Sequence, residues 1–168
     1  SDLESPEWGC TFVVLPFMYY ETYGDDSLIR KYYNGMRRYI DYMTTRANDG
    51  IVSFGLGDWY DYGDFRAGFS RNTPVPLVAT AHYYMVVRYL VEAARMLDNR
   101  YDVAYYTHLG EEINKAFHRE FYHKDTRQYG TGSQCSNALP LFLGMVPAED
   151  KQAVLDNLVA DIKRHGTG

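Results

Sequence analysis

Residues 29–43 read IRKYYNGMRRYIDYM, and the spacing of their apolar side chains predicts a helix with one buried face. The apolar residues fall at alternating steps of four and three, which places them along one side of an α-helix. They are Ile29, Tyr33, Met36, Ile40 and Met43. Arginine, lysine and aspartate occupy many of the other positions. We expect this helix to be capped by Asp26 or Ser27 and to end near Arg46.

The same pattern returns later in the chain, which indicates repeated helical hairpins. At one common offset, Tyr32-Tyr33, Met36 and Ile40 line up with Tyr105-Tyr106, Leu109 and Ile113. Amphipathic helices are predicted at about 26–46, 101–122 and 148–165, and mostly apolar helices precede them at about 9–22, 74–97 and 133–145. Because a helix that is apolar all round is usually buried, the apolar helices should form an inner layer. The sequence therefore predicts an all-α fold, a partial (α/α)6 toroid of three hairpins, with no domain boundary within residues 1–168.

The composition excludes several classes of protein. With 46% hydrophobic and 23% charged residues, the chain has enough apolar material for a core and is not of a disordered type. The net charge of -5 is spread without a basic stripe, so we expect no nucleic acid partner. The sequence contains no run of about 18 apolar residues, so no membrane-spanning helix is predicted. The 17 tyrosines fit either a polar core between helices or a surface that stacks on sugars.

The connections between hairpins predict a binding site at one end of the toroid. In an up-and-down array, every connection from an outer helix to the next inner helix lies at the same end, and long loops on a rigid scaffold often carry sites. Indole rings stack on sugar C–H faces, while carboxylates and amides bind hydroxyls. We therefore predict sugar binding by Trp8, Trp59 and Asp58, with Asp61 and Gln134 as weaker candidates. The alternative is that the two tryptophans only close the end of the barrel.

The chemical motifs by themselves do not assign a catalytic residue. Asp58, Asp61 and Asp64 lie in a glycine-rich stretch, and glycosidases use two carboxyl groups, but most acidic loop residues are solvated or cap turns. The histidines show no paired ligand spacing, so no metal site is predicted. His118 and His123 lie five residues apart across a helix end, where we expect them to be exposed to solvent.

A set of motifs extends this interpretation. They are Pro6-Glu7-Trp8-Gly9, Tyr20-Glu21-Thr22-Tyr23-Gly24-Asp25, Tyr39-Ile40-Asp41-Tyr42, Gly57-Asp58-Trp59, Thr73-Pro74 and Gly132-Ser133-Gln134. In this order the chain resembles bacterial α-L-rhamnosidases of glycoside hydrolase family 78, from Trp8 to the closing residues 161–166. The resemblance implies an (α/α)6 barrel that hydrolyses terminal α-L-rhamnosides with inversion and without a cofactor. A rhamnose-containing glycan or glycoside is then the expected partner.

The resemblance also implies that the catalytic acid and base lie outside this chain. In that family a glutamic acid upstream of the position of Trp8 protonates the leaving oxygen. A glutamate base near a Trp-Glu pair, downstream of the position of His165, activates water, and inversion needs the two carboxyls about 6.5–9.5 Å apart. We therefore expect no catalytic residue here and no activity of the chain alone. Trp8 and Trp59 match positions that wall the rhamnose pocket, Asp58 adjoins them, and Cys10 stands where the family often has an acid.

Two further functions stay open on the residues alone. Another glycosidase or a glycoside phosphorylase could use the same toroid, because fold does not determine function. A helical-repeat binding module would have short connections on both sides, and the long segment 47–73 argues against it. About half a toroid would also expose the apolar surface of its inner helices at two flanks. We therefore expect the chain to associate with itself.

Overall fold

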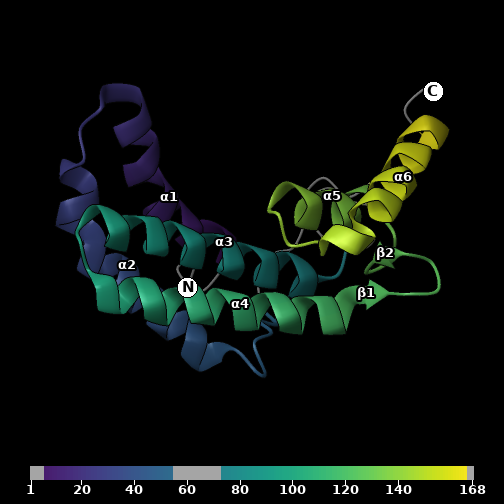
Figure 1. Cartoon of the computed structure of the whole chain (residues 1–168), viewed down its shortest axis with the longest axis horizontal. Helices are drawn as coiled ribbons and strands as arrows, with labels where there is room; N and C mark the ends of the chain where they lie inside the picture. The colour runs from purple at the N-terminus through teal and green to yellow at the C-terminus, as the bar shows by residue number, and fades with distance from the viewer. Residues whose placement is uncertain (1–5, 55–72, 166–168) are drawn as a thin grey trace.

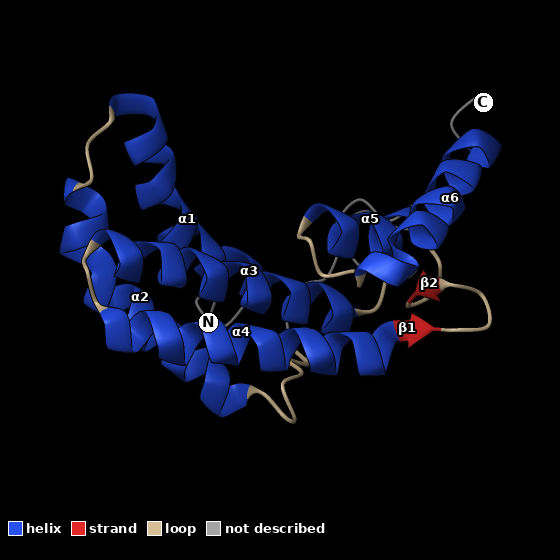
Figure 2. Cartoon of the chain, in the orientation of Figure 1, coloured by secondary structure: helices blue, strands red, loops and turns tan. Residues whose placement is uncertain are grey.

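The computed structural model describes residues 6–54 and 73–165, with side chains from Val13 onward in the first helix. These residues form six α-helices and one pair of short antiparallel strands, shown in blue and red in Figure 2. The elements are α1 (Pro6–Tyr23), α2 (Ser27–Arg46), α3 (Val75–Met96), α4 (Arg100–Phe121), β1 (Tyr122–His123), β2 (Gln128–Tyr129), α5 (Gln134–Phe142) and α6 (Ala148–His165). All six predicted helices are present, and the all-α prediction is confirmed. No described helix is both long and apolar enough to cross a bilayer.

The helices pair into three hairpins, α1–α2, α3–α4 and α5–α6, with α3 at the centre. Helix α3 packs against α1, α2, α4 and α5. It runs parallel to α5, because Thr73 Oγ1 lies 2.8 Å from Ser133 Oγ where both helices begin, and Arg88 donates to the Leu143 carbonyl at 2.8 Å near the end of α5. In Figure 1, α5 and α6 accordingly lie at the end of the α3–α4 pair where α3 begins. The alternation of inner and outer helices thus follows the pattern predicted from the sequence.

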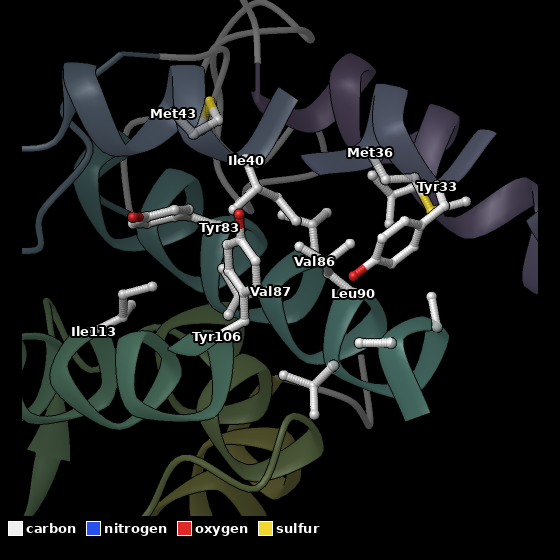
Figure 3. Packing of buried hydrophobic residues seen from close by; sticks show 14 of the residues in the cluster. Tyr33, Met36, Ile40, Met43, Tyr83, Val86, Val87, Leu90, Tyr106 and Ile113 are labelled. Carbon is white, nitrogen blue, oxygen red and sulfur yellow. The ribbon is translucent and has the colours of Figure 1, made fainter. Parts of the chain in front are cut away.

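The main core forms where α2 and α4 cover α3. Figure 3 shows Met36 and Ile40 of α2 facing Val86 and Leu90 of α3, with Ile113 approaching from α4. Each of these side chains is at most 1% exposed. The stretch 29–43 therefore supplies its whole predicted stripe to this core. Burying an aliphatic side chain of this kind stabilises the fold by about 1.5–3 kcal/mol.

The sequence repeat has a structural counterpart in two reciprocal hydrogen bonds between the outer helices. Tyr33 of α2 donates to Asp102 of α4 at 2.5 Å, and Tyr106 of α4 donates to Asp41 of α2 at 2.8 Å. Both tyrosines are buried, and burial together with the aspartate partner raises the pKa of each phenol above its ordinary value. The repeated tyrosine thus joins neighbouring hairpins through a satisfied polar contact.

The short strand pair was not predicted. Tyr122 pairs with Tyr129 and His123 with Gln128, so the segment predicted as a loop closes into a hairpin. Tyr129 then enters a second core with Leu77 of α3 and Phe117 of α4. Strands of two residues are too short for alternation to reveal them.

Three helices expose apolar side chains that the sequence pattern placed inside. In α1, Leu15 and Met18 are each 56% exposed, because the described part of the chain packs only α2 and α3 against this helix. Helix α5 is shorter than predicted, and Phe142 at its end is 87% exposed. On α6, Leu155, Leu158 and Ile162 form an apolar stripe in the sequence, and the structure buries this stripe only in part. Val154 is fully buried, Leu158 is half-buried, and Leu155 and Ile162 are exposed.

Candidate functional site

Inner helices α3 and α5 begin side by side, and a chain of hydroxyl groups joins their ends. Thr73 contacts Ser133 at 2.8 Å, and Ser133 donates to Ser136 Oγ at 2.9 Å while accepting from the Ser136 amide at 3.1 Å. A threonine followed by a proline, as at Thr73-Pro74, is a sequence signal for a helix N-cap, but Thr73 does not cap α3. The capping position is Pro74, without a side-chain bond, and the Thr73 hydroxyl contacts Ser133. We call the start of these two helices, residues 73–77 and 133–137, the rim.

The rim is shaped by a tight turn that enters α5. Gly130 has φ +56°, and a Cβ there would lie 2.9 Å from both Leu77 Cδ1 and Ser136 Oγ. The Tyr129 amide donates to Asn137 Oδ1 at 2.8 Å, which fixes the turn against the first turn of α5. Thr73, Ser136 and Asn137 are each at most 1% exposed. These polar groups therefore hold the rim in shape and do not face solvent.

An aromatic cluster with one histidine supports the rim from the strand pair. His118 Nδ1 lies 2.8 Å from Tyr129 Oη, and the His118 ring stacks on Tyr122 with centroids 4.5 Å apart. Tyr122 donates to Asp150 at 3.0 Å, which ties α6 to the same cluster. Burial and the nearby Asp150 carboxylate raise the pKa of the Tyr129 phenol. The expectation that His118 is exposed is therefore wrong, whereas His123 is exposed as predicted.

A family model described as the bacterial alpha-L-rhamnosidase 6 hairpin glycosidase domain matches residues 3–168. The chain belongs to this family. Its three hairpins of alternating inner and outer helices agree with the arrangement that the description names.

Several relatives illustrate the likeness to bacterial α-L-rhamnosidases. An alpha-L-rhamnosidase of Formosa agariphila is 29% identical over 96% of this chain and 18% of its own length. The structure of the alpha-L-rhamnosidase from Dictyoglumus thermophilum superposes with a TM-score of 0.89 and 31% identity, over 96% of this chain and 18% of that one. The Streptomyces avermitilis enzyme, solved with L-rhamnose, has a TM-score of 0.83 and 26% identity over 94% of this chain and 14% of its own. The chain thus spans less than a fifth of these relatives.

The predicted sugar-binding residues lie partly within the described structure. Gln134 is the first residue of α5, where its exposed side chain belongs to the rim. Trp8 lies inside the first turn of α1, whereas the sequence placed it just before the helix, and its side chain is outside the described residues. Asp58, Trp59 and Asp61 lie wholly outside the described residues. The binding roles of all five remain predictions.

The sequence did not point to His82 of α3 as a candidate site residue. His82 is half-buried two turns into α3, and its Nδ1 lies 2.8 Å from the Val78 carbonyl. A carbonyl accepts a hydrogen bond, so the neutral ring carries its proton on Nδ1, which leaves Nε2 as an acceptor. Only its distance from the start of an inner helix could have drawn attention to it. In residues 6–54 and 73–165, no group of three or more His, Cys, Asp and Glu side chains could hold a metal ion.

Proposed function

We propose that this chain is the central segment of the catalytic domain of an α-L-rhamnosidase and supplies part of the wall of its rhamnose pocket. In this proposal Trp8 and Trp59 stack on the sugar ring, while Asp58, Asp61 and Gln134 bind its hydroxyl groups. The substrates are terminal α-L-rhamnosides. Membership of the rhamnosidase family is the basis for proposing a rhamnoside as the ligand of this chain.

The common start of α3 and α5 is the observation that carries this proposal. The contact between Thr73 and Ser133 brings the chain entering α3 beside the first turn of α5. In sequence, Asp58, Trp59 and Asp61 lie 12 to 15 residues before Thr73, and Gln134 is the first residue of α5 at the rim. The L-rhamnose bound by the Streptomyces avermitilis relative supports rhamnose as the sugar.

The chemistry follows from the inverting mechanism that we infer for the parent enzyme. One carboxylic acid protonates the leaving oxygen, and a carboxylate on the other face of the sugar activates water. We place both groups outside this chain, so that its residues orient the sugar and keep bulk water away from it. The chain alone is then inactive, because positioning without acid and base leaves the glycosidic bond intact.

The parent protein provides the direct test. Purified parent should release rhamnose from 4-nitrophenyl α-L-rhamnoside, and the first sugar seen by proton NMR should be the β-anomer. Matched 4-nitrophenyl α-L-fucoside and β-D-glucoside serve as controls and should be cleaved far more slowly. A parent that leaves every rhamnoside intact, or that needs inorganic phosphate to cleave one, would exclude the hydrolase assignment in favour of another glycosidase or a phosphorylase.

A further inference from the structure

His82 of α3 carries a hydrogen-bond acceptor that no described group uses. Its Nδ1 lies 2.8 Å from the Val78 carbonyl and carries the proton, so Nε2 is the nitrogen with a lone pair to offer. Within residues 6–54 and 73–165, Nε2 has no hydrogen-bond partner and does not belong to the buried polar atoms. The ring as a whole is half-buried, so Nε2 is an acceptor on a fixed side chain that is open to a ligand.

His82 lies on the inner side of α3, away from the outer helix of its hairpin. Val87 of the same helix faces α4, because a Cβ added at Gly110 would lie 3.6 Å from Val87 Cγ1. Five residues of an α-helix turn through roughly 140°, so His82 lies on a side of α3 that is turned away from α4. In a toroid of inner and outer helices, this side of an inner helix faces the axis of the ring.

A half-buried strip of α3 contains His82 and runs between the two cores. With Met85 and Tyr89, His82 follows steps of three and four residues, which place all three on one side of the helix. Beside this strip, Leu90 enters the main core in one direction and Ala81 enters the second core in the other. The inner helices α1 and α5 both pack on α3. The strip therefore lies between two neighbouring inner helices that the described chain itself supplies.

The imidazole of His82 lies close to the rim, although its backbone is two turns into α3. Helical side chains lean toward the N-terminus of their helix, and the contact from Nδ1 to the Val78 carbonyl shows that this ring does so. Val78 is three residues beyond Val75, the first residue of α3, so the ring lies about 4.5 Å along the helix from that start. A sugar held at the rim on the inner side of α3 is therefore within reach of Nε2.

We propose that His82 Nε2 accepts a hydrogen bond from one hydroxyl group of the bound α-L-rhamnosyl unit and so helps to select the sugar. This inference rests on the proposed function, since it needs a rhamnoside beside the rim. Ligand pockets fix orientation with a few polar groups set among apolar walls. Because Nε2 is carried by a packed inner helix and offers only an acceptor, it fixes the direction of one hydroxyl and disfavours sugars that lack this hydroxyl.

Deoxy substrates of the parent enzyme test this contact. Each analogue of 4-nitrophenyl α-L-rhamnoside lacks one ring hydroxyl, and kcat/KM is measured for the unaltered parent and for its His82→Leu variant. On the complete rhamnoside the variant should lose about tenfold in kcat/KM. On the analogue that lacks the hydroxyl bound by Nε2, parent and variant should have nearly equal kcat/KM, because the contact is absent in both. On the other analogues the tenfold difference should persist.

Further variants separate sugar binding from a structural role of the ring. Asparagine keeps an amide N–H near the position of Nδ1, whereas glutamine keeps an oxygen near the position of Nε2. His82→Asn should therefore behave like His82→Leu, while His82→Gln should stay within about threefold of the parent in kcat/KM. Tyr89→Phe removes a polar atom from the same strip about two turns farther from the rim and should change kcat/KM less than about twofold. Far-ultraviolet circular dichroism establishes that all variants keep their helices.

The possible failures of this inference and of the proposed function can be told apart. If the parent is active and His82→Leu and His82→Asn keep its kcat/KM, this inference alone is overturned. It is also overturned if His82→Leu loses the same factor on every deoxy analogue, because Nε2 then serves a protein group and not the sugar. An active His82→Asn beside an inactive His82→Gln would show that the contact with Val78 is what matters, with the same consequence. A parent that cleaves no rhamnoside overturns the proposed function and this inference with it.

Discussion

The buried carboxylate of Asp102 should be one of the costliest polar side chains to remove from this chain. It is 3% exposed and accepts hydrogen bonds from Tyr33 at 2.5 Å and Asn99 at 2.9 Å, with Arg37 at 3.4 Å. Each hydrogen bond to a charged group is worth about 1.5–3 kcal/mol, and the Arg37 ion pair adds less than about 1 kcal/mol because that side chain is 40% exposed. Asp102→Ala leaves the Tyr33 hydroxyl without its partner. We expect a loss of about 3–4 kcal/mol in the free energy of unfolding.

Two matched variants make this prediction specific. Glu92→Ala removes a carboxylate from an ion pair with Arg95 whose side chains are 57% and 56% exposed, so it should cost less than about 0.5 kcal/mol. Tyr33→Phe removes one hydroxyl while Asp102 keeps its other partners, and it should cost about 1–2 kcal/mol. The double variant Tyr33→Phe/Asp102→Ala should cost less than the sum of the two single losses, because both remove the same hydrogen bond.

Urea unfolding of each variant, followed by circular dichroism at 222 nm, measures these differences. The slope against urea should stay constant, so that the change reflects stability and not a different unfolded state. If Asp102→Ala proves no more harmful than Glu92→Ala, or if the losses of Tyr33→Phe and Asp102→Ala simply add, then the contact between α2 and α4 does not hold the hairpins together as argued.

Three further outcomes follow from the structure. Gly130→Ala should lower the free energy of unfolding in urea by about 2–3 kcal/mol, because the added Cβ would lie 2.9 Å from two side chains. Gly24→Ala is the control: its Cβ would enter open space, so it should cost only about 1 kcal/mol for the positive φ. The pKa of the Tyr106 phenol is raised in the folded chain, so the phenol stabilises the fold fully below the pKa of tyrosine in the unfolded chain, about 10. This stabilisation is lost as the pH rises above that pKa. Urea unfolding between about pH 9 and 11.5 should show a decline in the free energy of unfolding, and the decline should be smaller in Tyr106→Phe. In the parent enzyme, Trp59→Ala should raise KM for an aryl rhamnoside about tenfold or more while Trp59→Phe retains much of the affinity, and equal KM values for the two variants would argue against ring stacking.

Most of the secondary structure could be predicted because helical periodicity is a local property. The stripe from Ile29 to Met43 lies on one face whichever partner covers it, and the structure buries that whole face. Ser133, by contrast, has a contact that only the tertiary structure reveals. Its hydroxyl caps α5 and also joins α5 to Thr73, a contact across 60 residues that no local pattern contains.

From the sequence it could be predicted only at which end of the helical array the candidate site should lie, and not how its residues are supported. Order along the chain and the alternation of helices place Gln134 at the start of an inner helix, as the structure finds. The support beneath it was not foreseen, because the hydrogen bond between His118 and Tyr129 depends on a two-residue strand pair and not on any repeat. The half-buried position of His82 likewise depends on neighbours of α3 that are distant in sequence.

The sequence by itself determined the helices, their apolar faces and the family. These depend on residue types at short spacing or on their order along the chain. Only the tertiary structure decided which apolar faces are covered, because burial depends on how many helices surround a given one. Helix α3 has neighbours on both sides and hides its apolar surface, whereas the equally apolar α1 leaves Leu15 and Met18 exposed. The Tyr33–Asp102 and Tyr106–Asp41 contacts span 69 and 65 residues, so they exist only once the hairpins have packed.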